Sequence, residues 1–270
     1  MSLALIAGEG NLPNQIIQSC KQRDIDLIVI GFKGQTNLGT IDIPYAEFGL
    51  GSIGEVLRHL KRHSIKEIVF AGGIERPNIK TLGLDWMGAK WLKTLGLRAL
   101  KGDDDLLSGI LELLQKEGFT IIKPSNFLEN LMLPPGILTK ASPADQDLLD
   151  SERGAQILRS LSSQDVGQSA LVQNGLVLGI EAIEGTKALI ERCAPLKRPG
   201  PGGVLVKMAK IGQSKTIDLP TIGPETVQSL KDAGFAGIAA EEALTQVIDL
   251  EETIRLADEL GLFIVGIRND

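Results

Sequence analysis

The stretch LALIAGEGNLP, residues 3–13, decides the fold of this chain. Its apolar run 3–7 predicts a strand, and Gly8 and Gly10 predict a turn before a helix over 13–23. A second strand is expected over 26–30, where the unbroken apolar run is typical of a buried parallel sheet. A strand, a helix and a second strand in this order indicate a doubly wound α/β sheet.

The same alternation continues through the first half of the chain. Further strands are expected near 45–48, 67–71 and 120–123, and helices over 52–63, from about 82, and over 103–117. The sequence therefore predicts an α/β protein whose N-terminal domain, over 1–133, is Rossmann-like with a parallel sheet.

The segment Leu133-Pro134-Pro135-Gly136 is the expected domain boundary, because paired prolines and a glycine stop both helix and strand. We expect a linker over 134–140 and a second domain over 141–270. Asn174-Gly175 between two apolar runs predicts a hairpin of strands 169–173 and 176–182. Helices over 144–160, 224–233 and 250–260, with strands over 204–208, 237–240 and 263–266, make this a mixed α/β domain.

Composition narrows the classes of function. The 270 residues are 43% hydrophobic, so a large core is expected, and a net charge of -6 argues against a nucleic-acid binder. Cys20 and Cys193 are far apart and give neither a disulfide framework nor a zinc site, which fits a reducing cytoplasm. No apolar stretch approaches a membrane span. The oligomeric state stays open.

Two glycine turns are candidate ligand sites. Gly8-x-Gly10 resembles the start of a dinucleotide fingerprint, but Pro13 replaces its third glycine and Lys33 stands where an acid should hold the ribose, which disfavours NAD. A phosphate could still bind here, or this is an ordinary turn. Gly72-Gly73 follows a buried strand, where Arg76 could clamp a phosphate or nucleobase or lie on the surface.

Asp218 is the candidate catalytic acid. It ends a predicted strand just before a helix that begins at Pro224, so it should lie near exposed helical amides. Lys207 and Lys210 lie on the preceding candidate strand. A carboxylate among such donors could hold a divalent metal against a substrate phosphate, or Asp218 simply terminates a strand in a turn.

Other polar groups have two interpretations each. Gly102 and the three acids after it could bind metal, although helix capping explains them, and Arg153 could bind an anion or form a surface ion pair. The turn around 180–186 should bring Glu181, Glu184 and Thr186 to one rim. The only histidines, His59 and His63, are expected on a solvated helix face rather than at a zinc ion. Two histidines are too few for a histidine-rich dinuclear phosphoesterase site.

Segment 82–101 holds both tryptophans, Trp86 and Trp91, among lysines and apolar residues. It is either an interfacial membrane anchor or, as we favour, a core helix with lysines that extend to water.

Taken in order, seven segments resemble one family. It is the UDP-2,3-diacylglucosamine pyrophosphatases of lipid A biosynthesis, in the two-domain type that is unrelated to metallophosphoesterases. The segments are Ile6-Ala7-Gly8-x-Gly10-x-Leu12-Pro13, Gly72-Gly73-Ile74-x-Arg76-Pro77, Gly102-Asp103-Asp104-x-Leu106-Leu107, Arg153-Gly154, Gly167-Gln168-Ser169, Ile180-Glu181-Ala182-x-Glu184-Gly185-Thr186 and Asp218-Leu219-Pro220-x-x-Gly223-Pro224.

This resemblance implies a Mg²⁺-dependent hydrolase that gives UMP and 2,3-diacylglucosamine 1-phosphate (lipid X). The N-terminal domain would bind UDP and the C-terminal domain the diacyl sugar, in the cytoplasm or peripherally on the cytoplasmic face of the inner membrane. Asp218 matches the essential aspartate and would bind the metal or position the water. The nucleotide would contact Gly8, Gly10, Leu12, Gly73, Ile74 and Arg76. The diphosphate or sugar would contact Arg153, Gln168, Glu184, Thr186, Lys207 and Lys210. The alternative is a nucleotide-sugar-binding protein without hydrolysis.

Overall fold

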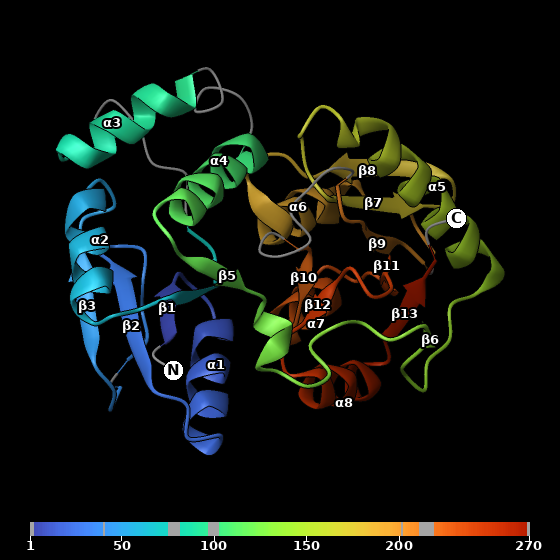
Figure 1. Cartoon of the computed structure of the whole chain (residues 1–270). Coiled ribbons are helices and arrows are strands. Elements are labelled where there is room, and N and C mark those ends of the chain that lie inside the picture. The colour runs from blue at the N-terminus through green and yellow to red at the C-terminus, as the bar shows by residue number, and fades with distance from the viewer. Residues whose placement is uncertain are drawn as a thin grey trace. The chain divides into compact units, whose positions relative to one another are not determined.

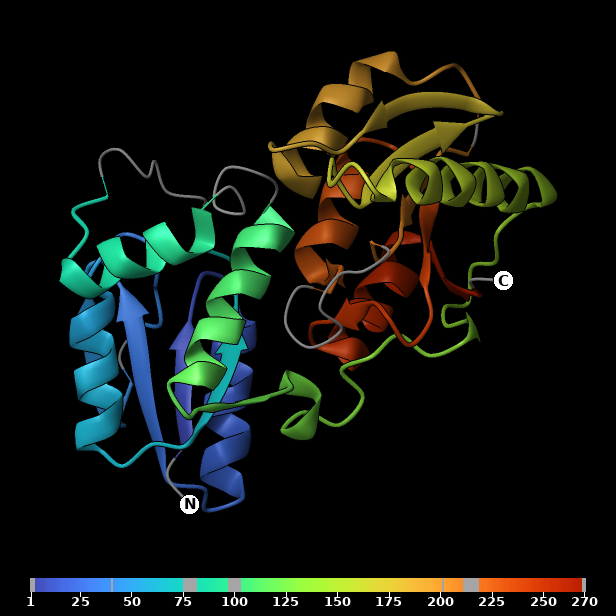
Figure 2. The ribbon, with the colours of Figure 1, turned by 45° about the horizontal axis from the view of Figure 1, so that its top comes forward.

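A computed structural model describes residues 3–39, 41–74, 82–96, 103–200, 202–210 and 219–268, without the side chains of Asp103 and Asp104. The chain divides into two compact units, residues 1–129 and 130–270. Each unit has its own sheet and its own hydrophobic core. Figures 1 and 2 show the helices and strands of both units from two directions.

The first unit is built on a five-stranded parallel sheet in the order β3-β2-β1-β4-β5. Its strands are β1 (Leu3–Ala7), β2 (Leu27–Phe32), β3 (Tyr45–Phe48), β4 (Glu67–Ala71) and β5 (Thr120–Ile122). Its helices are α1 (Leu12–Gln22), α2 (Ile53–Arg62), α3 (Trp86–Leu95) and α4 (Asp103–Lys116), followed by the short 3-10 turn η2 (Pro124–Asn126). The strand order reverses between β1 and β4, which is the switch point where open α/β sheets bind ligands.

Strand alternation divides the core of the first unit between two faces. Ala4 and Ile6 of β1 share a buried cluster with α2, α3 and α4, whereas Leu3 and Leu5 point to the opposite face. Trp91 of α3 belongs to the first of these clusters and is 6% exposed. The apolar stripe of α2 and the indole of Trp91 therefore hold these helices on the sheet.

The second unit has a six-stranded mixed sheet in the order β6-β13-β11-β9-β7-β8. Strands β9, β11 and β13 are parallel, while β6, β7 and β8 add antiparallel pairs at the two sides. A small parallel pair, β10 with β12, lies outside this sheet. The strands are β6 (Gly136–Ile137), β7 (Ser169–Gln173), β8 (Leu176–Ile180), β9 (Val204–Lys207), β10 (Thr221–Ile222), β11 (Gly237–Glu241), β12 (Gln246–Val247) and β13 (Phe263–Ile267).

Four helices complete the second unit. They are α5 (Asp145–Ser162), α6 (Gly185–Cys193), α7 (Pro224–Asp232) and α8 (Leu250–Leu260), with the 3-10 turn η3 (Ala194–Leu196) after α6. Helix α5 packs closely on β9, because a Cβ at Gly154 would lie 2.5 Å from Cγ2 of Val206. The glycine of the Arg153-Gly154 motif is therefore needed for packing.

The predicted fold class is confirmed: a parallel N-terminal sheet is followed by a mixed α/β unit. The predicted hairpin is also present, with Asn174 at φ 50° and Gly175 at φ 75° between β7 and β8. The sequence did not indicate the small pair β10–β12, or that β6 lies inside the expected linker 134–140 and pairs with β13. Among the described residues, no helix is both long and apolar enough to cross a membrane.

Candidate functional site

The two predicted glycine turns meet at the switch point of the first sheet. The amide of Gly8 donates to the carbonyl oxygen of Ala71 at 2.8 Å, and that of Glu9 donates to Gly73 O at 2.7 Å. The amide of Gly73 returns a bond to Glu9 O at 3.1 Å. The turns after β1 and β4 thus form one structure at the carboxyl edge of the sheet.

Two of the glycines are required by this contact. A Cβ at Gly8 would lie 2.2 Å from Gly73 O, and one at Gly72, where φ is +87°, would lie 2.4 Å from Glu9 O. Gly73 and Gly10 differ, because a Cβ at either would have no atom within 4 Å among the described residues. Open space over Gly73 and Gly10 is what a ligand needs for close approach to the backbone.

This geometry limits which amides can hold a phosphate. The amides of Gly8, Glu9 and Gly73 already donate within the paired turns, so a phosphate at these turns would need other donors, such as the amides at the start of α1. Leu12 is the first residue of α1, and Pro13 lies within its first turn. Ile74 is 39% exposed beside Gly73, and Arg76 lies outside the described residues.

A buried polar cluster lies at the carboxyl edge of the second sheet. The Lys207 ammonium, at the end of β9, donates to Thr186 Oγ1 at 2.8 Å and to the carbonyl oxygen of Thr221 at 2.9 Å. The Thr186 hydroxyl in turn donates to Glu181 Oε1 at 3.0 Å, and Ser169 Oγ lies 3.4 Å from Thr186 Oγ1. The strand that carries Lys207 and three other chain segments thus meet in this cluster.

Burial makes this cluster unusual. Lys207 is 4% exposed and Glu181 is 7% exposed. Burial lowers the pKa of Lys207, and the nearby charge of Glu181 acts in the opposite direction. The two bonds use two of the three N–H groups of the ammonium, so one N–H can still be donated to a ligand.

Gln168 lies beside this cluster. Its carbonyl oxygen accepts from the amide of Met208, and its side-chain Oε1 is buried without a hydrogen-bond partner among the described residues. The preceding Gly167 touches the backbone of Glu181, since a Cβ there would lie 2.0 Å from Glu181 O. Of the predicted sugar or diphosphate contacts, Gln168, Thr186 and Lys207 are therefore brought together.

The other predicted contacts lie elsewhere or are already paired. Lys210 forms an ion pair with Asp165, and Glu184 pairs with Arg192 at 2.7 Å. Hydrogen bonds from Arg192 lower the pKa of the Glu184 carboxyl. Arg153 is exposed on α5. Asp218, the predicted catalytic acid, lies outside the described residues, which resume at Leu219.

Glu241 is an acid that was not among the predicted site residues. It ends β11, is 1% exposed, and its Oε2 accepts from the amide of Ala209 at 2.9 Å. An acid after the apolar run 237–240, at the carboxyl edge of a parallel strand, was the available indication. Its bond to Ala209 holds the chain just after β9, next to Lys207.

Two remaining predictions concern polar groups of the first unit. His59 and His63 lie on α2 and just after it, with the His63 ring nitrogen Nδ1 2.9 Å from His59 O. Partial burial, followed by the charges of His63 and Arg62, lowers the pKa of His59. Helix α4 begins at Asp103, at the start of the predicted helix, while Gly102 lies outside the described residues, so the choice between metal binding and capping stays a prediction. No group of three or more metal-ligating side chains occurs in the described parts of the chain.

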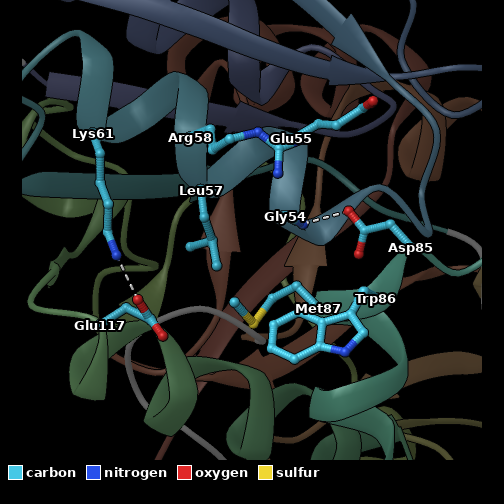
Figure 3. Close-up of a pocket in the computed structure, with 9 residues that line it drawn as sticks. All are labelled: Gly54, Glu55, Leu57, Arg58, Lys61, Asp85, Trp86, Met87 and Glu117. Atoms are coloured by element: carbon cyan, nitrogen blue, oxygen red, sulfur yellow. Dashed lines mark hydrogen bonds and ion pairs between the residues drawn. The ribbon is translucent and has the colours of Figure 1, made fainter.

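The tryptophans of α3 have different environments. Trp91 is buried in the core, whereas Trp86 is 75% exposed and the Lys90 ammonium lies 5.5 Å from its ring centroid. Trp86 also lines a cavity of about 290 Å³ that α2 and α3 enclose with Glu117 (Figure 3). Two acids of this cavity have partners within it, because Glu117 binds Lys61 at 2.6 Å and Asp85 accepts from the amide of Gly54 at 2.6 Å.

Comparisons with known proteins identify relatives over nearly the whole chain. The family described as LpxI N-terminal domain matches residues 2–131, and that described as LpxI C-terminal domain matches residues 134–265. A protein of Caulobacter vibrioides named UDP-2,3-diacylglucosamine pyrophosphatase LpxI is 36% identical over 271 residues, which cover 98% of this chain and 97% of the relative.

Similarities to solved structures are much weaker. A UDP-glucose 4-epimerase of Thermus thermophilus in complex with NAD is 13% identical with a TM-score of 0.31, covering 54% of this chain and 41% of that one. The precorrin-6A reductase CobK is 9% identical with a TM-score of 0.37, covering 100% and 89%. Similarities this weak carry no argument about function.

Proposed function

Because this chain belongs to the LpxI family, we propose that it hydrolyses the diphosphate of UDP-2,3-diacylglucosamine in lipid A biosynthesis. The products are UMP and 2,3-diacylglucosamine 1-phosphate, and the reaction depends on Mg²⁺. The observation that best supports this proposal is the near-complete match to the Caulobacter relative, together with a buried lysine cluster suited to an anionic substrate.

The first unit binds the UDP part in this proposal. Its switch point offers close backbone approach over Gly73 and Gly10, and the start of α1 offers helical amides to a phosphate. Six residues are assigned to the nucleotide, namely Gly8, Gly10, Leu12, Gly73, Ile74 and Arg76. Gly8 acts indirectly, by letting the two turns approach each other.

The second unit binds the sugar and the phosphate attached to it. Lys207 donates its remaining N–H to a phosphate oxygen, and Thr186 holds the ammonium in place. Gln168 faces the sugar. Lys210, Glu184 and Arg153 are less suited, because the first two are already paired with Asp165 and Arg192 and Arg153 lies exposed on a helix.

Mg²⁺ is assigned to Asp218 and to the substrate's own phosphate oxygens. This ion typically binds one or two carboxylates plus substrate phosphates and water, so it does not need the large ligand cage that is missing from the described residues. When bound, it would withdraw charge from the phosphate oxygens.

The bond changes follow from the proposed products. Water attacks the sugar-side phosphorus, the bond from that phosphorus to the bridging oxygen breaks, and UMP leaves with the bridging oxygen. Asp218 orients the water, and Lys207 stabilises negative charge on the phosphate under attack. Both water protons are lost to solvent at neutral pH or to the products.

Release of UMP from UDP-2,3-diacylglucosamine tests the proposal directly. We expect turnover with Mg²⁺, loss on addition of EDTA, and oxygen-18 from labelled water in the sugar phosphate. Asp218→Ala should reduce turnover sharply while substrate still binds. Binding without any UMP release from the wild-type protein would instead support a non-hydrolytic nucleotide-sugar-binding protein.

Exposed apolar side chains beside the polar cluster suit the acyl chains. Ile183, in the turn between β8 and α6, is 91% exposed, and Val166 precedes Gly167 at 42% exposed. Burying an isoleucine side chain contributes about 1.5–3 kcal/mol, so Ile183→Ser should raise the KM by about 10- to 100-fold. Leu176→Ser, at the far end of β8, is the matched control with unchanged KM.

We also propose that the protein works in the cytoplasm, in peripheral contact with the inner membrane through Trp86. The exposed indole beside Lys90 has the amphipathic character of an interfacial contact. Flotation with liposomes of anionic phospholipid tests this proposal on the full chain. Trp86→Ala should float less than wild type, and equal flotation would remove Trp86 from membrane contact. Trp91 is unsuitable for the test because it belongs to the core.

A further inference from the structure

We propose that Glu181 determines sugar specificity, because its unpartnered carboxylate oxygen accepts a hydrogen bond from a sugar hydroxyl or amide N–H. Together with Lys207 it would fix the direction in which the acylated sugar phosphate lies in the second unit. This inference rests on the proposed function and names the part of the substrate that the buried cluster recognises.

The two oxygens of Glu181 have different environments. Oε1 accepts from the Thr186 hydroxyl at 3.0 Å, whereas Oε2 is buried and has no hydrogen-bond partner among the described residues. The side chain as a whole is only 7% exposed. A buried acceptor without a donor is costly, so such a group in a native protein calls for a specific explanation.

Contacts to both its main chain and its side chain hold Glu181 within this cluster. Its amide donates to Ser169 O at 2.8 Å, and its own carbonyl is in close contact with Gly167. Thr186 holds Oε1 while also accepting from Lys207. The free oxygen is therefore held in place before any ligand arrives.

The chemistry of this oxygen excludes the phosphate as its partner. An ionised diphosphate presents only acceptors, and its negative charge would repel the carboxylate. A second cation is also disfavoured, because the Lys207 ammonium is already close to Glu181 and the two groups hydrogen-bond to the same hydroxyl, that of Thr186. A neutral donor is left, and an acylated glucosamine offers an amide N–H and ring hydroxyls.

A second acceptor strengthens this assignment. Gln168 Oε1 is also buried without a described partner, on the segment that contacts the backbone of Glu181. The cluster thus has a donor end at Lys207 and an acceptor end at Glu181 and Gln168. A sugar phosphate fits this polarity in one direction, with its phosphate at the lysine and its sugar donors at the two acceptors.

Affinity for 2,3-diacylglucosamine 1-phosphate tests the proposal with the full chain. Glu181→Gln keeps an acceptor for Thr186 but directs an NH₂ group toward the sugar donor. We expect this change to weaken binding about 10- to 100-fold, the loss seen when a buried polar pair is mismatched. Glu191→Gln, on the exposed side of α6, should leave the affinity unchanged.

Three ligand analogues identify the contact itself. Each lacks one donor: the amide N–H is replaced by an ester, or the 4- or 6-hydroxyl by a methoxy group. The analogue that lacks the contacted donor should bind the wild type more weakly than the unmodified ligand does. Its affinity should not fall further in Glu181→Gln, as a direct contact requires. An equal loss for all three analogues would assign Glu181 a structural role. A changed Mg²⁺ requirement in place of this coupling would assign the oxygen to the cation.

Two further measurements keep the outcomes distinct. Thermal unfolding checks that the variant is folded, and Glu181→Asp, which keeps the charge but retracts the oxygen, should show the same coupling if Glu181→Gln does not fold. Because binding is measured apart from turnover, coupling without hydrolysis contradicts the proposed function alone. Hydrolysis without coupling contradicts the Glu181 assignment alone.

Discussion

The two units place their candidate sites at equivalent positions, the carboxyl edges of parallel strands, but build them from different chemistry. In the first unit the main chain forms the site, because the turns after β1 and β4 hydrogen-bond through the backbone of Glu9 and Gly73. In the second unit side chains form the site, through the hydrogen bonds that join Lys207, Thr186 and Glu181. The first site depends on glycines, which have no side chain to keep the two turns apart. The second site depends on buried charges of opposite sign that offset each other.

This difference predicts how each site fails. An added methyl group should damage the first site by separating its two turns. Removal of one charge should damage the second site while leaving its fold largely intact.

Gly8→Ala should lower the free energy of unfolding by about 3 kcal/mol, because its Cβ would lie 2.2 Å from the backbone oxygen of Gly73. Urea unfolding measures the loss. Gly73→Ala is the matched control, since a Cβ there meets nothing described within 4 Å, and its stability should change by less than about 0.5 kcal/mol.

The same pair of variants separates packing from binding. If a ligand approaches the backbone over Gly73, Gly73→Ala should weaken UMP binding although the protein is as stable as wild type. Equal stability losses in the two variants would contradict the contrast between a glycine needed for packing and one left open.

Lys207→Met should reduce kcat by about 100-fold, the usual cost of removing one donor that stabilises charge in a transition state. UMP affinity of the first unit should be unchanged. Steady-state kinetics and UMP titration measure the two quantities, and Lys231→Met, which removes an exposed lysine of α7, serves as the control. A comparable loss in that control would show that the effect is not specific to the buried cluster.

Most of the fold could be predicted from the sequence because its patterns are local. The apolar runs 3–7 and 26–30 and the Asn174-Gly175 turn each define an element within a few residues. The pair β10–β12 could not be predicted, since it joins two-residue strands that are far apart in the chain. Strand β6 was missed for the same reason, as it pairs with β13 after a segment that prolines mark as a turn.

The candidate sites were predictable to different degrees. Paired glycines after buried strands pointed to the first site, because a parallel sheet aligns the carboxyl ends of its strands. In the second unit, the turn around 180–186 predicted that Thr186 and Glu181 share one rim, and the two side chains do form a hydrogen bond. No local pattern, however, shows that Lys207 meets them. Glu184 was expected at the same rim and pairs instead with Arg192, a partner from the next turns of α6 that spacing alone did not single out.

Asp150→Asn should lower the free energy of unfolding by about 2 kcal/mol without changing KM. Asp150 is as buried as Glu181, but both its oxygens are satisfied: Oδ2 accepts from the amide of Asn174 at 2.7 Å and Oδ1 from Gly175 at 2.6 Å. The substitution removes one charged acceptor from the hairpin turn, which typically costs about 1.5–3 kcal/mol.

Urea unfolding and substrate kinetics on the same preparation measure the effect of Asp150→Asn. Together with Glu181→Gln they distinguish a carboxylate that stabilises the fold from one that awaits a ligand. A raised KM in Asp150→Asn at unchanged stability would reverse the two roles.

The pH dependence should also differ between the two sites. Burial lowers the pKa of Lys207 below the ordinary lysine value of 10.5, so turnover should fall with rising pH at a lower pH than an exposed lysine would cause. UMP binding through main-chain amides should not follow this transition. The residual activity of Lys207→Met should lack this alkaline limb.

The same pKa shift has the opposite effect on folding. Between the lowered folded pKa and the ordinary value, the unfolded chain holds one more proton at Lys207 than the folded chain does, so the contribution of Lys207 to stability rises with pH. Urea unfolding of wild type and Lys207→Met at several alkaline pH values isolates this contribution as a difference. A constant difference, together with an alkaline limb that persists in the variant, would show that another group controls the pH dependence.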